Sequence, residues 1–235
     1  MPGAELNDNI PVKRISNITH RLINSRHPAV GVFDKVATRD QAIAAMLVEQ
    51  LTNPRHTSAS ERFFRIPEGE LVLGKPGATF IMGAFIHTGE GGGRFHTEEL
   101  GAWYASLSIE TALREMAHHQ YIRLKKSHMD INGTIIQLRE LVARVNADFH
   151  DLCDLERTRP ELYDANDYSH SQSLANGLRS ANSNGICYKS VRHMGGENLV
   201  VFKPPLLPPI QQGDHYQYEW CKDSEPVISK LTNIS

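Results

Sequence analysis

The stretch GGRFHTEELGAWYASLSIETALREM, residues 92–116, carries the most information about fold and chemistry. It places Arg94 ahead of a short apolar segment, 102–107, which contains Tyr104 and is typical of a β-strand. Ser108 then occupies the position of a helix N-cap, because its hydroxyl can accept a hydrogen bond from a free amide of the first turn. The sequence therefore predicts a strand followed directly by a helix over 108–126.

Glu115 lies on that predicted helix, one residue before Met116 and beside the apolar stripe. A carboxylate at the edge of a buried face needs a partner or a ligand. The alternative is an ion pair at the surface with Arg114 or Arg123. The spacing leaves both interpretations open.

The rest of the chain alternates short apolar and polar segments. Strands are expected over 78–88, 134–141, 143–152, 185–190 and 198–204, helices over 39–51 and 168–184, and loops over 55–75 and 154–168. The first of these helices is expected to stop at Asn53-Pro54. Because there is no clean βαβ repeat, the expected fold class is α+β, a compact mixed sheet with flanking helices.

Composition limits the classes of partner. The 235 residues contain 25 basic and 27 acidic side chains, a formal net charge of −2. This balance gives little support for nucleic-acid or membrane-surface binding, although a local arginine site for a phosphate is compatible with it. The most apolar stretch, 78–86, is shorter than the roughly 20 residues that span a bilayer. With no signal-peptide segment at the N-terminus, we expect a cytoplasmic protein.

Cysteine and histidine patterns give no metal signature. Cys153, Cys187 and Cys221 are separated by more than 30 residues, so we expect neither a zinc site nor a redox pair. Such sparse usage is typical of a reducing compartment. The twelve histidines, among them His118-His119, form no HExxH motif. No metal is expected.

Two further motifs are weak on their own. The glycine-rich run GEGGG at 89–93 lacks the Lys-Ser/Thr of a phosphate-binding loop, so we interpret it as a mobile connector that carries Arg94. Ser190 follows a predicted strand just before a turn, where its hydroxyl could meet a ligand or bond local backbone. No GxSxG motif of a serine hydrolase is present.

Taken together, five segments in this order resemble the RES-domain family, which is named for an arginine, a glutamate and a serine. The segments and the residues that they give are HRLINSR at 20–26 (Arg21), GGRF at 92–95 (Arg94), WYASLSIETALREM at 103–116 (Tyr104 and Glu115), DYSHSQSLANGLR at 167–179 (Ser169) and GICYKSVRHMGGENLVVF at 185–202 (Ser190). Which of the two serines is the namesake is left open.

The resemblance implies a fold and an activity. Members are similar in fold to ADP-ribosylating toxins, with a cleft for NAD+ as substrate rather than cofactor. Most are bacterial toxins that break the nicotinamide–ribose bond by hydrolysis or phosphorolysis. One branch transfers ADP-ribose to a protein. The usual partner is an Xre-like antitoxin that blocks the cleft.

The resemblance also implies roles for the matching residues. The catalytic set would be Glu115, Arg21 and Tyr104, and the substrate-binding set Arg94, Ser169 and Ser190. A forked guanidinium suits the pyrophosphate of NAD+. A carboxylate near the ribose would stabilise the oxocarbenium-like transition state.

The expected organisation is a flexible leader at 1–17, a RES-like catalytic domain at 18–210 and a C-terminal extension at 211–235. Residues 37–90 are extra relative to many members and could form a lid, a partner contact or an added layer. Two alternatives to NAD+ cleavage stay open: a mono-ADP-ribosyltransferase with a protein target, and a non-catalytic module that binds a partner.

Overall fold

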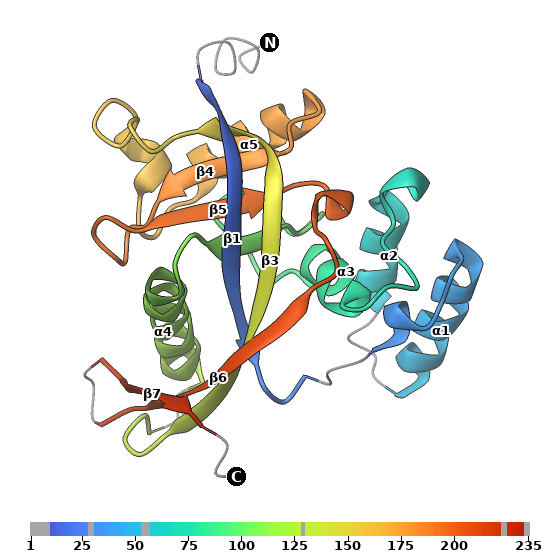
Figure 1. The fold of residues 1–235 in the computed structure, drawn as a ribbon, viewed down its shortest axis with the longest axis horizontal. Coiled ribbons are helices and arrows are strands. Elements are labelled where there is room, and N and C mark those ends of the chain that lie inside the picture. Colours follow the sequence, from blue (N-terminus) through green and yellow to red (C-terminus); the bar gives the residue numbers. More distant parts are fainter. Residues whose placement is uncertain (1–9, 28–30, 53–56, 128–129, 222–224, 233–235) are drawn as a thin grey trace.

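The computed structural model describes residues 10–27, 31–52, 57–127, 130–221 and 225–232. Within them the chain forms one seven-stranded sheet with helices around it (Figure 1). The strands are β1 (Val12–Asn24), β2 (Trp103–Ser106), β3 (Ile135–Asp151), β4 (Gly185–Lys189), β5 (Glu197–Val201), β6 (Gln211–Glu219) and β7 (Val227–Leu231). The α-helices are α1 (Arg39–Thr52), α2 (Thr57–Arg65), α3 (Ala78–Ile86), α4 (Ile109–Lys126) and α5 (Ser169–Ser180). Short 3-10 helices cover Val32–Asp34, Glu68–Glu70, Pro160–Tyr163 and Pro204–Leu206. The expected α+β class is confirmed.

Strand β1 closes part of the sheet into a ring. The strand order is β1-β2-β5-β4-β3-β6-β7, and β1 also pairs with β3 along its whole length. Its contact with β2 is limited to the pair His20 and Ser106. Only β3 and β4 run parallel among the described strands, so the sheet is mixed.

The long strand β3 is the axis of the sheet. Alternate residues Ala143, Val145, Ala147 and Phe149 are buried, and the residues between them are exposed or half-buried, which is the period-two pattern of a strand with one covered face. We expected two strands here, 134–141 and 143–152. They form one, because Val142 pairs with His20 of β1 on one side and with Gln211 of β6 on the other.

Helices α1, α2 and α3 lie together at one side of the sheet, and α4 lies at the other (Figure 1). The first three share one apolar core with the sheet, in which Met46, Phe63 and Phe85 pack in the same cluster as Val145 and Leu199. Within residues 37–90, these helices therefore form a layer that packs against the sheet.

The apolar run at 78–88, which we expected to be a strand, is the helix α3. It is buried almost all round, so it lacks the alternation of apolar and polar residues by which a surface helix is recognised. Its first turn is capped from a distance: Asp34 accepts hydrogen bonds from the amides of Gly77 (2.6 Å) and Thr79 (3.1 Å). A cap that lies 45 residues from Thr79 leaves no local signal.

Two other expectations were wrong in part. Residues 12–17, which we placed in a flexible leader, are the start of β1, and residues 1–9 lie outside the described part. This segment is mostly polar because most of its side chains are exposed, while its backbone pairs with β3. Residues 57–65, expected to be a loop, form α2, whose buried Ala59 and Phe63 are one turn apart. The expected stop at Asn53-Pro54 also lies outside the described residues.

The C-terminal segment, which we expected to be an extension, joins the sheet. Strand β6 pairs with β3, and β7 pairs with β6. Tyr218 and Trp220 are fully buried and pack with Leu124 of α4 in a separate core cluster. This hairpin is therefore part of the packed structure that holds α4.

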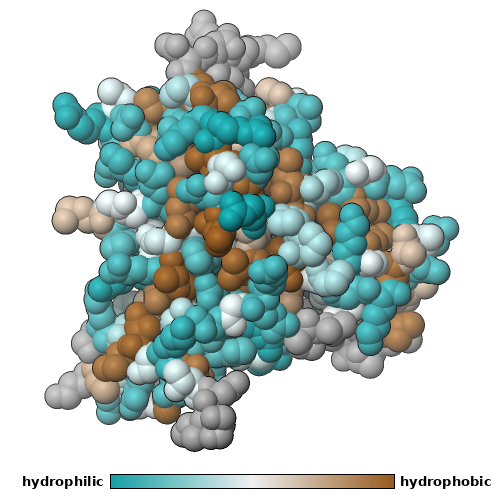
Figure 2. Space-filling model, in the orientation of Figure 1, coloured by the Kyte–Doolittle hydropathy of each residue, from teal (hydrophilic) through white to brown (hydrophobic). Residues whose placement is uncertain are grey.

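On the side drawn in Figure 2, hydrophobic side chains gather over the middle of the sheet, and hydrophilic side chains surround them. Apolar residues exposed on β1 and β3 include Val12, Ile18 and Ile135. Among the described helices, none combines the length and apolar composition that a membrane crossing requires.

Candidate functional site

A cavity of about 680 Å³ opens between β1, β2, α4 and the turns that follow Glu90 and Tyr188. Its volume lies within the range of small-molecule sites. The polar residues that line it and concern the chemistry are Arg21, Arg94, Tyr104, Glu115, Arg192 and Asn198. Four of the six expected site residues, which are far apart in the sequence, thus meet at one place.

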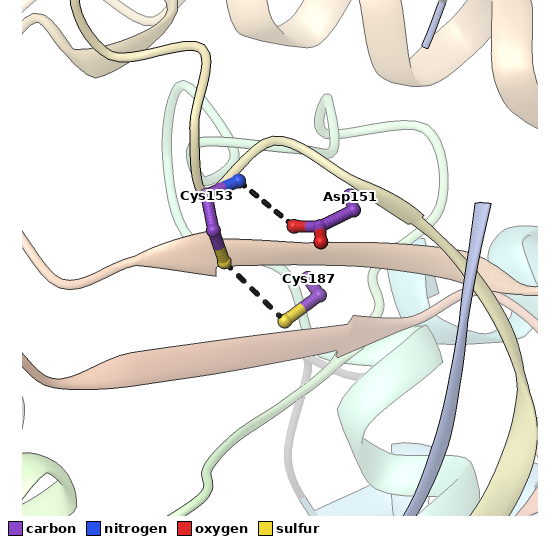
Figure 3. Close-up of side chains that lie close together, drawn as sticks. All are labelled: Asp151, Cys153 and Cys187. Atoms are coloured by element: carbon purple, nitrogen blue, oxygen red, sulfur yellow. Dashed lines mark hydrogen bonds between the residues drawn. The ribbon is translucent and has the colours of Figure 1, made fainter. Parts of the chain in front are cut away.

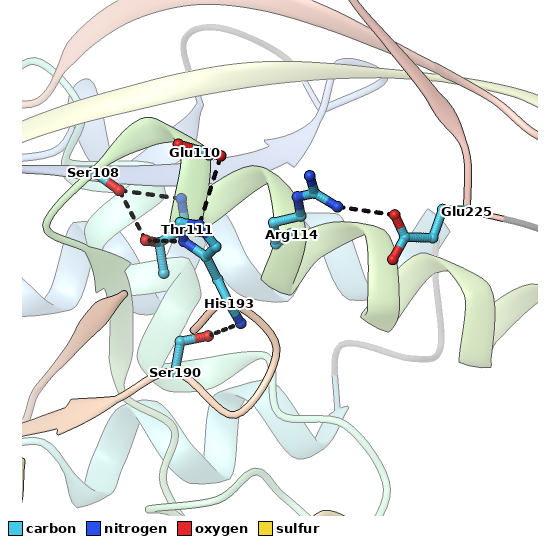
Figure 4. Close-up of polar contacts among 7 residues, drawn as sticks. All are labelled: Ser108, Glu110, Thr111, Arg114, Ser190, His193 and Glu225. Carbon is cyan, nitrogen blue, oxygen red and sulfur yellow. Dashed lines mark hydrogen bonds and ion pairs between the residues drawn. The ribbon is translucent and has the colours of Figure 1, made fainter. Parts of the chain in front are cut away.

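Glu115 projects from α4 into this cavity and is half-buried. Its Oε1 atom accepts two hydrogen bonds, from the Ser190 hydroxyl (2.6 Å) and from the Asn198 amide (2.8 Å). Because both bonds end on one oxygen, Oε2 is the oxygen that can accept from a ligand. The alternative of an ion pair with Arg114 does not hold, since Arg114 instead pairs with Glu225 at 2.9 Å (Figure 4).

The turn after β4 fixes the Ser190 hydroxyl. This hydroxyl donates to Glu115 and accepts from the amides of Arg192 (3.1 Å) and His193 (2.9 Å). The turn is tied to the start of α4 by His193, whose Nδ1 lies 3.0 Å from the Thr111 hydroxyl (Figure 4). The predicted cap is also present, with the Ser108 oxygen accepting from the Thr111 amide at 3.2 Å. Helix start and turn therefore hold Glu115 and Ser190 in register.

Asn198, at the start of β5, was not among the residues expected from the sequence. It is 3% exposed, donates to Glu115 and accepts from the Ser106 hydroxyl at 2.7 Å. The only hint in the sequence is a polar side chain at the head of the apolar strand NLVVF. A buried amide with all its partners on one network positions its neighbours precisely.

Arg21 enters the cavity from β1. Its guanidinium donates to the Tyr104 carbonyl at 3.0 Å and stacks over the Trp103 ring, with 4.8 Å between Cζ and the ring centroid. Burial lowers the pKa of Arg21 to about 10, so the side chain remains a cation at neutral pH. One hydrogen bond leaves the other donors of the fork available to an anion.

Arg94 differs from its expectation. We expected it on a mobile connector, but it is 8% exposed, donates to the Leu162 carbonyl at 2.9 Å and lies over the Tyr168 ring. The preceding glycines are structured as well, because the Gln172 side chain donates to the carbonyls of Gly91 (2.8 Å) and Gly93 (3.1 Å). Arg94 is thus held in place by the protein itself, ready for a ligand.

The Tyr104 hydroxyl is engaged by protein groups. It accepts from the Phe95 amide at 2.9 Å and lies 2.9 Å from His96 Nδ1. Burial, followed by nearby arginines, lowers the pKa of His96 to about 4, so the ring that shares this hydrogen bond is neutral at pH 7. Burial also raises the pKa of Tyr104. Tyr104 is therefore a neutral side chain at the wall of the cavity, and its hydroxyl is hydrogen-bonded to Phe95 and His96.

Ser169 is not brought to the cavity. It is exposed at the start of α5, where its amide donates to Asp167 Oδ1 at 2.8 Å. Its neighbour Tyr168 lines the cavity instead. Of the two candidate serines, Ser190 is the one in contact with Glu115.

Among the described residues, the one cluster close enough to hold a metal ion lies outside the cavity: Asp151, Cys153 and Cys187. The wide spacing in the sequence, from which we expected neither a zinc site nor a redox pair, does not keep two of the cysteines apart in space. Their sulfur atoms are 3.6 Å apart, because β3 and β4 run side by side although their cysteines are 34 residues apart.

Charges in the cavity favour an anionic ligand with one cationic centre. Arg21, Arg94, Arg192 and Lys126 line it, against the carboxylates of Glu90 and Glu115. Arginine forks are suited to phosphate oxygens, and the single half-buried carboxylate is suited to a positive charge or to hydroxyl donors.

A comparison with family models bears out the family expected from the sequence. The model of the RES domain matches residues 63–221, about two thirds of the chain, and the chain belongs to this family. Among solved structures, a chain of the M. tuberculosis MbcT–MbcA toxin–antitoxin complex superposes with a TM-score of 0.45 and 12% identity, over 89% of this chain and 87% of that one. A comparison with curated proteins finds no match.

Proposed function

We propose that this RES-family chain is a cytoplasmic, toxin-like enzyme that cleaves the nicotinamide–ribose bond of NAD+, by hydrolysis or by phosphorolysis. The observation that carries the proposal is the Glu115 carboxylate, which Ser190 and Asn198 hold at the wall of a cavity that also presents Arg21 and Arg94.

Binding would use the arginines. NAD+ carries two phosphate charges in its pyrophosphate, and Arg21 and Arg94 each retain guanidinium donors after their single carbonyl bond. Both cations are already stacked on aromatic rings, so little side-chain freedom would be lost on binding.

The bond that breaks joins the ribose C1 atom to the nicotinamide nitrogen. Its electron pair returns to the pyridine ring, so nicotinamide leaves neutral and no general acid is needed. The ribose is left with oxocarbenium character. The Glu115 carboxylate stabilises this state because its negative charge attracts the developing positive charge and because it accepts hydrogen bonds from the ribose hydroxyls. Water then forms the new bond to C1 and releases a proton, or inorganic phosphate forms it instead.

The test is consumption of NAD+ by the purified chain, with and without phosphate, with products identified by mass. We expect free nicotinamide with ADP-ribose or its 1″-phosphate. Glu115→Gln should keep NAD+ affinity within a few-fold and lower turnover by at least about 100-fold. The substitution removes a negative charge whose main effect is on the positive charge that develops on the ribose in the transition state. Glu99→Gln, an exposed carboxylate paired with Arg65, is the matched control and should keep full turnover.

Three results would contradict the proposal. If Glu115→Gln turns over NAD+ as fast as the parent, Glu115 is not the catalytic carboxylate. If label passes from NAD+ to a protein band with no free ADP-ribose, the chain is a mono-ADP-ribosyltransferase. Binding to a partner without any NAD+ loss would instead identify a non-catalytic module.

The family resemblance also leads us to propose an Xre-like antitoxin as the protein partner, seated over the cavity mouth. Such a partner should inhibit turnover competitively with NAD+. It should also protect rim residues such as Lys126 from chemical modification.

A further inference from the structure

A second group of chemically reactive side chains lies at the ends of β3 and β4, apart from the cavity. The Sγ atoms of Cys153 and Cys187 are 3.6 Å apart, and both residues are buried (Figure 3). The donor atoms of Asp151, Cys153 and Cys187 all lie within 4.8 Å of one another. The proposed chemistry of NAD+ cleavage uses none of them.

The backbone brings these residues together with little freedom. Asp151 is in register with Cys187 in the parallel pair of β3 and β4, and the Leu152 amide donates to the Cys187 carbonyl at 2.8 Å. The chain then turns, with the Cys153 amide donating to Asp151 Oδ1 at 2.9 Å. That bond orients the carboxylate and leaves its second oxygen available, as outer-shell bonds do in metal centres.

Glu197 of β5 borders this group and contacts one of its members, Cys187, although its carboxylate is not among the donor atoms that lie within 4.8 Å of one another. Cys187 and Glu197 point to the same face of the β4–β5 pair, opposite to Tyr188 and Asn198, and Cys187 Sγ lies 3.9 Å from Glu197 Oε2. The Lys13 ammonium lies 3.8 Å from the same carboxylate oxygen. This ion pair places a cation beside the cluster.

We propose that Asp151, Cys153 and Cys187, here called the cysteine cluster, bind Zn²⁺ in a tetrahedral site whose fourth ligand is Glu197, which turns its carboxylate from Lys13 towards the metal. With zinc–sulfur bonds of about 2.3 Å, tetrahedral geometry separates two thiolates by roughly 3.8 Å, close to the spacing already present. Two thiolates with two carboxylates suit the borderline-soft Zn²⁺ better than the hard Mg²⁺ or Ca²⁺.

Charge and protons balance in this site. Zn²⁺ binds cysteine as the thiolate, so each of the two thiols gives up its proton when the metal binds. Binding of Zn²⁺ forms two zinc–sulfur bonds and releases the two thiol protons to solvent, so the net charge of the cluster does not change. Affinity should therefore rise with pH, because two protons must leave.

Zinc would tie three strands together behind the wall of the cavity. Glu197 is followed directly by Asn198, and β4 leads within one residue to Ser190. These are the two residues that hold Glu115. A bound ion that is absent from the unfolded state should raise the Tm of the whole chain.

The experiment uses the full chain with Cys221→Ser, since Cys221 is exposed and could take up zinc by itself. Reduced protein is dialysed against zinc and then against buffer, and zinc is counted per chain. We expect one zinc, release of two protons per zinc at weak buffering, and a thiolate charge-transfer band when cobalt replaces zinc. Cys187→Ser and Cys153→Ser should each weaken binding by more than about 100-fold, because loss of an outer-shell partner alone costs 10–100-fold.

Glu197→Gln replaces the carboxylate ligand by an amide of the same size, so it leaves no cavity in the fold. This variant keeps the test valid if the serine variants fail to fold. It should weaken zinc binding at least about 10-fold. The proposal is overturned if the reduced, folded parent binds no zinc, or if zinc binds equally well to the parent and to all three variants. It is also overturned if cobalt binds without a thiolate band.

Discussion

At the scale of single residues, the network around Glu115 gives the first prediction. Asn198→Ala removes one of the two donors to Glu115 and leaves the Ser106 hydroxyl without its acceptor. Because the Glu115 carboxylate is then held less firmly, kcat for NAD+ cleavage should fall by about 10–100-fold, with a smaller change in KM. Steady-state kinetics measure both. Ser106→Ala keeps Asn198 as the donor to Glu115, so its kcat should fall less. An equal fall in kcat for both variants would contradict the view that Asn198 acts directly on Glu115 and Ser106 only through Asn198.

His96 gives a prediction on acid stability. Its pKa is about 4 in the folded chain, mainly because of burial, against 6.5 for the unfolded chain. Between these values the unfolded state binds a proton that the folded state does not, so stability falls as pH drops from 6.5 towards 4. The loss should approach about 3 kcal/mol.

Urea unfolding at several pH values measures this loss. His96→Gln should flatten the slope over that window, whereas His170→Gln, an exposed histidine on α5, should not. If the parent and His96→Gln lose stability equally between pH 6.5 and 4, the histidine is not held neutral in the folded chain.

At the scale of elements, α3 depends on a cap that another segment supplies. Asp34→Ala removes the acceptor of the Gly77 and Thr79 amides and should lower the free energy of unfolding by about 2 kcal/mol. Chemical denaturation measures it, with the exposed Asp154→Ala as control. A loss no larger than that of the control would mean that packing alone holds the helix.

The elements also show what local sequence can and cannot predict. Helix α4 is predictable with its cap because Ser108, the apolar stripe and the basic last turn all lie within one segment. Helix α3 is not, because its helical conformation depends on burial and on Asp34. The strand β1 escapes prediction because its pairing partner β3 decides its structure, while its own side chains are mostly polar.

The candidate site divides in the same way. The motifs of the RES family predict Arg21, Arg94, Tyr104, Glu115 and Ser190 as site residues from sequence alone, and these residues do meet at one cavity or at its wall. Motif order cannot separate Ser190 from Ser169, nor find Asn198 or the pair of Cys153 and Cys187, because these depend on which strands lie side by side.

At the scale of the whole molecule, the C-terminal hairpin gives a test of domain organisation. A chain ending at residue 210 loses Tyr218 and Trp220 from the core beside α4 and uncovers one edge of β3. We expect it to aggregate or to lack cooperative unfolding, which light scattering and circular dichroism would show. A chain ending at residue 221 keeps β6 and should stay folded. A soluble, active 1–210 chain would restore the view of residues 211–235 as an accessory extension.

The ring closed by β1 has a consequence for protein synthesis. Val12 pairs with His150 and Asn24 with Leu138, so more than 100 further residues must leave the ribosome before the first strand can find its partner. The donors that hold Glu115 are made later still, at positions 190 and 198. Such distant contacts form late in folding. A nascent or prematurely terminated chain therefore lacks the assembled candidate site, which forms only when the chain is nearly complete.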